Sequence, residues 1–204
     1  MSTPSAQTDS FVRDRLPPRE QWPEFRYDLP ELQIPDQANV ATTLLGDAIA
    51  KGWGNRLMLR APGETYTYAE ANAQVNRIAE MLIKDYKLEP GNRVLLRGGN
   101  SIGMALAWLG VVKAGLIAVA TMPLLRAVEL DKIIDKAQPA LALCEQLHCH
   151  QVAHPGAARQ NPQRAGPWVV RLVLGLRHAA GPGARRAAHE FLLRSVDPVS
   201  GPGQ

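Results

Sequence analysis

RVLLRGGNSIGMALAWLGVVKAGLIAVATMPLL, residues 93–125, is the stretch of this sequence from which the fold can be predicted. Residues 94–96 form a short apolar run closed by two glycines, and Asn100 is placed to cap a helix because its side chain can accept a first-turn N–H. Apolar residues then recur every three or four positions until Gly115, which favours the left-handed end of a helix. The uncharged run 117–120 is typical of a strand covered on both faces. The stretch therefore predicts a strand, a helix and a second, parallel strand.

Two other interpretations fit parts of this stretch. Residues 102–125 are long and apolar enough for a membrane span, but Lys113 at the middle would cost about 2.5–3.5 kcal/mol and lies beside the glycine that ends the helix. The glycine-rich run GGNSIG, residues 98–103, matches neither GxGxxG nor GxxxxGK[ST]. A tight turn followed by a helix cap is therefore favoured over a phosphate loop, and no membrane span is expected.

Further elements are predicted on either side of this unit. Thr67 and Glu70 form a capping box, which opens the clearest amphipathic helix of the chain. The other predicted elements are a helix after Asn39 that Gly52 ends, a hairpin of residues 57–60 and 65–68 around Pro62-Gly63, a helix over 127–137 that Pro139 ends, and a strand over 140–144.

Strand and helix alternate from residue 93 to residue 144, which predicts an α/β fold, a partial doubly wound layer with right-handed crossovers. Residues 1–38 are rich in proline and carry Phe11, Trp22, Phe25 and Tyr27, so we expect an extended arm lying on the surface of that layer. Three segments follow: the arm (1–38), the layer (39–147) and a tail (148–204).

The tail has a different composition from the rest of the chain. It contains seven arginines, two acidic residues and all five histidines, but neither lysine nor isoleucine, and it supplies the whole net charge of +4. We expect a low-complexity basic tail that is largely disordered, and we interpret it as an out-of-frame translation of a GC-rich gene. The predicted layer would then end at Cys144 with an uncovered sheet edge, through which the chain could self-associate.

Metal and nucleic-acid sites are not predicted. Five zinc-type side chains crowd together in the sequence, but neighbouring residues point in different directions and no second half of a ligand set follows. Arginines of the tail could contact phosphates, but aromatic residues for base stacking are nearly missing, so we expect at most weak polyanion binding and no specific nucleic acid. The residues concerned are Cys144, His148, Cys149, His150 and His154 for zinc, and Arg177, Arg185, Arg186 and Arg194 for phosphate.

The amino end has no signal-peptide pattern, because charged residues interrupt any apolar run, and the two cysteines give no disulfide framework. A cytoplasmic location is expected by default.

Several blocks of residues 9–147 resemble one family. They are FVRDRLPP (11–18) with QWP (21–23), TYAE (67–70) with VNR (75–77), PGNRV (90–94), and KAG (113–115) with AVATMPLLR (118–126). In this order they are similar to the 2-aminobenzoate-CoA and benzoate-CoA ligases, aryl-CoA ligases of the AMP-forming adenylating superfamily. The resemblance ends near His148.

This resemblance implies ATP-dependent activation of an aromatic carboxylate and thioester formation with CoA, with Mg²⁺ as a further cofactor. The family needs a phosphate loop resembling [ST]GTTGxPK and a carboxy-terminal lysine. This sequence contains no such loop, and no lysine follows Lys136. No catalytic residue can be assigned, and we expect the chain to be inactive alone, either as a ligase fragment or as a non-catalytic binding fragment.

One ligand-contacting residue is implied by the resemblance. Arg126 follows the AVATMPLL block, where similar ligases place basic residues near the CoA phosphates, and arginine pairs strongly with phosphate. The alternative is a solvated arginine in front of a helix, which is the usual state of a charged loop residue.

Overall fold

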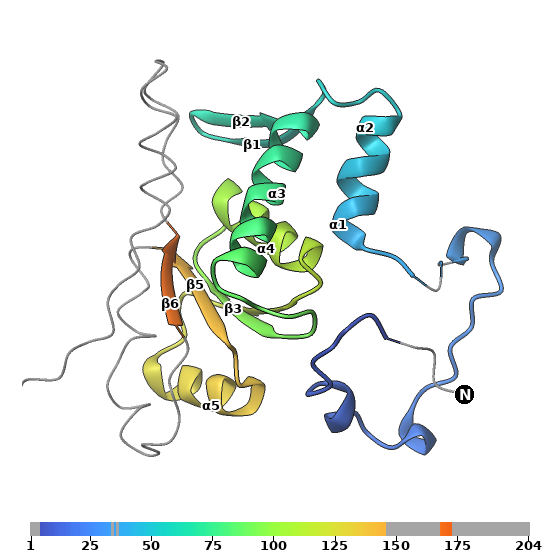
Figure 1. Cartoon of the computed structure of the whole chain (residues 1–204), viewed down its shortest axis with the longest axis vertical. Coiled ribbons are helices and arrows are strands. Elements are labelled where there is room, and N and C mark those ends of the chain that lie inside the picture. The colour runs from blue at the N-terminus through green and yellow to red at the C-terminus, as the bar shows by residue number, and fades with distance from the viewer. Residues whose placement is uncertain (1–4, 34, 36, 146–167, 173–204) are drawn as a thin grey trace, which may run out of the picture.

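Two β-sheets organise the chain in the computed structural model, which describes residues 5–33, 35, 37–145 and 168–172 (Figure 1). The larger sheet has the strand order β4-β3-β5-β6, and all its neighbouring strands are parallel. The smaller sheet is an antiparallel hairpin. The predicted α/β class with a parallel sheet is confirmed. The strands are β1 (Leu57–Ala61), β2 (Glu64–Thr67), β3 (Arg93–Arg97), β4 (Ile117–Thr121), β5 (Leu141–Glu145) and β6 (Trp168–Leu172).

Helices cover both faces of the larger sheet. Because successive side chains of a strand point to opposite faces, Val94 and Leu96 of β3 face α4 (Ile102–Lys113), which packs against α3 (Tyr68–Lys84). Leu95 faces the other way and joins a smaller cluster with Leu130 of α5 (Ala127–Ala137). Each fully buried leucine or valine stabilises the fold by about 1.5–3 kcal/mol. The strand between the two clusters is therefore the centre of the core.

The first helical segment comprises α1 (Val40–Thr42), a π-helical turn η4 (Thr43–Asp47) and α2 (Ala48–Ala50). The Asn39 side chain caps it by accepting the Thr42 N–H at 3.2 Å, and its amide group donates to the Val112 carbonyl of α4 at 2.9 Å. Gly52 follows with φ of 76°, a left-handed conformation that favours glycine. The predicted cap and end of this helix are confirmed.

Two other helix signals are confirmed and one is corrected. Thr67 and Glu70 form the predicted capping box at the start of α3, and Gly115 adopts φ of 74° after α4. The cap of α4 is Ser101, however, and not Asn100, since the Ser101 Oγ accepts the Met104 N–H at 3.1 Å. Two adjacent polar residues could each cap this helix, and the sequence does not distinguish them.

The amino-terminal arm contains short 3₁₀ turns, η1 (Arg13–Arg15), η2 (Arg19–Gln21) and η3 (Pro30–Leu32). Its attachment to the body lies at the start of β3. The Asp9 carboxylate pairs with the Arg93 guanidinium and accepts the Asn92 amide at 2.8 Å, and the Asp9 N–H donates to the Pro90 carbonyl at 3.0 Å. A Cβ on Gly91 would lie 2.5 Å from the Asp9 carbonyl oxygen, so only glycine permits this approach.

Beyond this attachment, the arm differs from the prediction. Trp22, Phe25 and Tyr27 are exposed to 38, 58 and 50%, and their rings contact one another instead of the layer. Phe11 is half-buried and lies between the guanidinium groups of Arg15 and Arg93. Figure 1 shows the middle of the arm looping away from the sheets. The prediction that these aromatic side chains lie on the layer is therefore wrong for three of the four.

The edge of β5 also differs from the prediction. Strand β6, which comes from the tail, pairs with β5 along its length, from Leu141 opposite Trp168 to Glu145 opposite Leu172. The sheet edge expected to be uncovered after Cys144 is therefore paired. The expectation of disorder for the rest of the tail falls outside the described residues.

Within the described ranges, the longest apolar helix is too short to cross a membrane.

The arm attachment should depend on pH. Partial burial would raise the pKa of Asp9, but hydrogen bonds from the Phe11 N–H, Arg93 and Asn92 and the Arg93 charge together hold it below the ordinary 3.8. A lowered folded-state pKa stabilises the fold above the unfolded value, and the gain disappears as the pH falls through the folded value. We expect Asp9→Asn to lower the free energy of unfolding by about 2 kcal/mol at pH 7, and the difference to shrink below about pH 4. Urea unfolding of both proteins across pH 3–7 measures this, and a difference that is constant over that range would contradict it.

Candidate functional site

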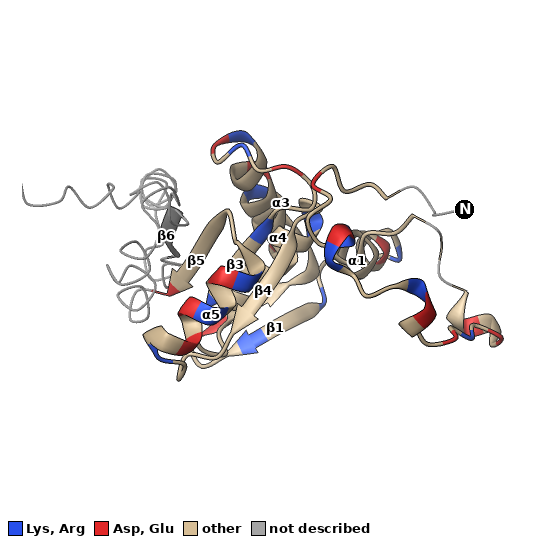
Figure 2. Cartoon of the chain, turned by 90° about the horizontal axis from the view of Figure 1, so that it is seen from below, with Lys and Arg blue, Asp and Glu red and all other residues tan. Residues whose placement is uncertain are grey.

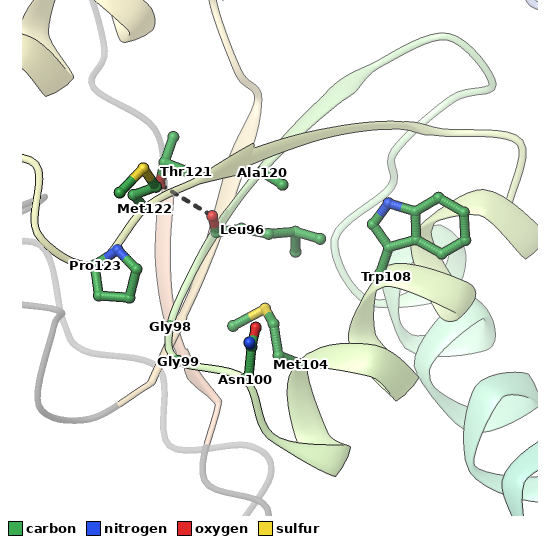
Figure 3. A pocket seen from close by; sticks show the side chains of 10 residues that line it. All are labelled: Leu96, Gly98, Gly99, Asn100, Met104, Trp108, Ala120, Thr121, Met122 and Pro123. Carbon is green, nitrogen blue, oxygen red and sulfur yellow. Dashed lines mark hydrogen bonds between the residues drawn. The ribbon is translucent and has the colours of Figure 1, made fainter. Parts of the chain in front are cut away.

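A cavity of about 300 Å³ lies at the carboxyl edge of the parallel sheet, where β3 and β4 end (Figure 3). Its walls come from the loop after β3, the loop after β4 and the first turns of α4. The lining residues are Leu96, Gly98, Gly99, Asn100, Met104, Trp108, Ala120, Thr121, Met122 and Pro123.

The topology explains why the cavity lies there. The chain leaves β3 toward α4 on one face of the sheet and leaves β4 toward α5 on the other face. Two neighbouring parallel strands whose connections diverge in this way leave a crevice outside their carboxyl ends, and ligands of open α/β sheets bind in that crevice. The cavity therefore lies at the carboxyl edge of the sheet, beside β3, the strand at which the strand order reverses.

The loop after β4 is held by a buried arginine. Arg97, the last residue of β3, is fully buried and donates to the carbonyl oxygens of Met122 at 2.9 Å, Pro123 at 2.9 Å and Leu125 at 2.7 Å. Burial lowers the pKa of Arg97 from its ordinary value, and the electrostatic interaction with the nearby Cys144 partly opposes this effect. The guanidinium stays charged at neutral pH and fixes one wall of the cavity.

The loop after β3 is held by a carboxylate. Glu145, the last residue of β5, accepts the Gly99 N–H at 2.9 Å and the Ser101 hydroxyl at 2.5 Å. A Cβ on Gly98 would lie 2.8 Å from the Glu145 Cγ and Cδ, so the absence of a side chain there makes room for Glu145. Because the Gly99 donor is already used within the protein, this geometry supports a tight turn over a phosphate loop.

The cavity itself is mainly apolar. Figure 3 shows the side chains of Leu96, Met104 and Trp108 on one side and Met122 and Pro123 on the other, with Asn100 at the loop between β3 and α4. The Thr121 hydroxyl donates to the Leu96 carbonyl at 3.1 Å. Such a lining suits an uncharged, largely apolar group with a few polar atoms.

Arg126 lies next to this site in the chain. It is exposed, directly precedes α5 and follows Leu125, whose carbonyl Arg97 holds. Its N–H donates to the Glu129 carboxylate at 2.8 Å, and its guanidinium makes no ion pair with the described residues. The structure thus leaves this guanidinium available to an anionic ligand.

The other candidates contribute nothing to the cavity. Cys144 is fully buried in β5, and the described residues include no cluster of histidine, cysteine and carboxylate side chains that could hold a metal. His148, Cys149, His150 and His154, like the four tail arginines, lie outside the described residues. Figure 2 shows the charges of the described chain distributed over the helices, the arm and the strand ends.

Comparison with known proteins gives a consistent result. The family described as AMP-binding enzyme matches residues 47–190, more than two thirds of the chain and past His148, where the resemblance described above ends. The chain is 27% identical over 117 residues to the benzoate–CoA ligase of Thauera aromatica. This match covers 57% of this chain and 22% of that protein. It is 30% identical over 135 residues to the 3-hydroxybenzoate–CoA/4-hydroxybenzoate–CoA ligase of the same organism. This match covers 65% of this chain and 25% of that protein.

Solved structures show the same fold. The anthranilate CoA ligase AuaEII in complex with anthranoyl-AMP superposes with a TM-score of 0.61 at 21% identity, covering 71% of this chain and 27% of that one. The benzoate CoA ligase of Burkholderia xenovorans LB400 superposes with a TM-score of 0.58 at 18% identity, and the match covers 67% of this chain and 26% of that one. The chain thus spans about a quarter of the length of these proteins.

The role of Arg97 can be tested by a conservative replacement. Lysine keeps the charge but cannot reproduce the guanidinium fork, so Arg97→Lys should leave at least one of the three carbonyls without its donor. We expect a loss of about 2–3 kcal/mol in the free energy of unfolding, measured with urea, because hydrogen bonds to charged groups contribute about 1.5–3 kcal/mol each. The matched control, Arg77→Lys on the exposed face of α3, should change it by less than about 0.5 kcal/mol. Equal effects of the two replacements would contradict this role.

Proposed function

Because the chain belongs to the family of AMP-binding enzymes, we propose that it corresponds to the amino-terminal part of an ATP-dependent ligase that joins an aromatic carboxylate to CoA. Such a ligase forms an acyl-adenylate and pyrophosphate from the acid and ATP, and the CoA thiol then displaces AMP. The aromatic class is supported by the benzoate and hydroxybenzoate named for two of its relatives. A ligase of this kind would work in the cytoplasm.

The observation that carries the proposal is the cavity between the loops after β3 and β4. It lies where α/β sheets bind ligands, and its apolar lining suits the uncharged part of an extended ligand such as CoA. Arg97 and Glu145 fix its two walls, and Arg126 supplies an exposed guanidinium close by in the chain. In this proposal the chain's own residues bind and orient part of the ligand.

The residues present do not fit the phosphates of ATP. The glycine loop after β3 uses its Gly99 N–H on Glu145, and the chain lacks a loop resembling [ST]GTTGxPK as well as any lysine after Lys136. ATP and Mg²⁺ are therefore proposed for the full-length relatives' reaction only. For this chain alone we propose no turnover, and the alternative function is a non-catalytic binding fragment.

A pyrophosphate-release assay tests the lack of activity. With ATP, Mg²⁺ and either benzoate or 2-aminobenzoate, the 204-residue chain should release pyrophosphate no faster than a control without protein. The physical reason is that no described group is placed to stabilise the charge that develops on the α-phosphate. Turnover clearly above the control would overturn the fragment interpretation and establish the ligase directly.

Arg126 can be tested by binding. We propose that its guanidinium contacts a phosphate of CoA, so Arg126→Ala should weaken CoA binding about tenfold in isothermal titration calorimetry, and the loss should be smaller at high salt. Arg77→Ala, which removes an exposed arginine from α3, is the matched control and should leave the affinity within about twofold. The same titration with dephospho-CoA, which lacks the 3′-phosphate, shows whether Arg126 contacts that phosphate or the pyrophosphate of CoA. Equal affinities of the wild type and both variants would show that Arg126 is a solvated loop residue.

A further inference from the structure

The outer edge of β4 is a sheet edge with which no described strand pairs. In the order β4-β3-β5-β6, β4 has β3 on one side and no described strand on the other. Its residues are half-buried or exposed throughout, whereas every residue of β3 is buried. The edge strand is the place where a sheet can accept a further strand.

The hydrogen bonds of β4 show which groups point outward. The Ile117 N–H donates to the Asn92 carbonyl at 2.9 Å, so the backbone groups of Ile117 face β3. Because the direction alternates along a strand, Val119 and Thr121 also face β3, and the N–H and C=O groups of Ala118 and Ala120 point to the open edge. The register with β3 is continuous from Ile117 to Thr121, without a bulge.

In the described part of the chain, β4 carries none of the protections that are written into the sequence of an edge strand. Soluble proteins block such edges with lysine, proline, bulges or inward-pointing charges. The segment 114–125 has no charged residue, and its single proline, Pro123, follows the strand. Exposed apolar side chains follow β4, with Met122 exposed to 61% and Leu124 to 83% in the next loop and Val128 to 67% in α5. Figure 2 shows β4 as an uncharged ribbon.

We propose that this edge binds the same edge of a second copy of the chain, in antiparallel orientation. A two-fold axis at Val119 places Ala118 opposite Ala120 of the second copy, and the two residues exchange both of their backbone hydrogen bonds. Ile117 then lies opposite Thr121, so no like charges meet. A two-fold interface needs such a self-complementary surface, and the uncharged β4 edge provides it.

The proposed interface does not rest on the proposed ligase activity, although Ala120 and Thr121 of β4 also line the cavity. It uses the backbone of β4 and leaves Arg97, Arg126 and Glu145 outside the contact. A failure of the pyrophosphate or CoA experiments therefore says nothing about it, and the test below uses no ligand.

The sharpest variant is Ala120→Pro, because proline removes an outward N–H and leaves the bonds from β4 to β3 intact. In analytical ultracentrifugation the full chain should dimerise with rising concentration, and Ala120→Pro should raise the dissociation constant at least about tenfold. Ala120→Thr keeps the N–H and favours a strand, so it is the matched control and should stay within about twofold. Ala120→Lys, which adds a charge to the edge, should weaken the dimer as proline does, and it replaces Ala120→Pro if circular dichroism shows that variant to be unfolded.

Amide hydrogen exchange provides a second measurement. Exchange at Ala118 and Ala120 should slow as the protein concentration rises, whereas exchange at Val119, whose N–H already faces β3, should not change. A chain that stays monomeric at high concentration would overturn the proposal. An Ala120→Pro variant that folds and dimerises like the wild type would also overturn the proposal. Assemblies larger than a dimer that persist in the Ala120→Pro variant would overturn it as well.

Discussion

The structure depends on two buried arginines at the ends of one buried strand. Arg93 and Arg97 begin and end β3, and both side chains point to the face that α5 covers. Arg93 donates to the carbonyls of Ala137 and Gln138 at the end of α5, at 3.0 and 3.1 Å, and Arg97 donates to three carbonyls in the loop before α5. A buried cation must find oxygen partners, since leaving it unpaired is costly. The central strand therefore fixes both ends of the helix that packs across it.

The same constraint gives the cavity its shape. A cation at the end of β3 gathers carbonyl oxygens from one loop, and the Glu145 carboxylate at the end of β5 gathers an N–H and a hydroxyl from the other. The two loops are thus fixed by charges of opposite sign, which need opposite kinds of backbone group. The walls have their spacing before any ligand binds, and an apolar ligand group would meet a preformed surface.

Local signals in the sequence predicted the elements well, because each signal acts within a few residues. The capping box of Thr67 and Glu70 and the left-handed Gly115 depend only on their own turns, and the structure has both. Arg97 and Glu145 were missed because their partners lie 25 to 46 residues away, and nothing in a single sequence distinguishes a buried arginine from a solvated one. The pairing of β5 with β6 was missed for the same reason, since it joins residues on either side of a long arginine-rich stretch.

The attachment of the arm has a consequence for the order of folding. Asp9 binds Arg93 across 84 residues of chain, and Asn39 binds Val112 across 73. The amino terminus leaves the ribosome first, yet its partners at Pro90 and Arg93 are made much later, and Arg93 itself is held by the end of α5. Contacts so distant in sequence form only after the loops between them have closed. During synthesis the start of the arm must therefore wait, unattached at Asp9, until the chain has emerged as far as the end of α5.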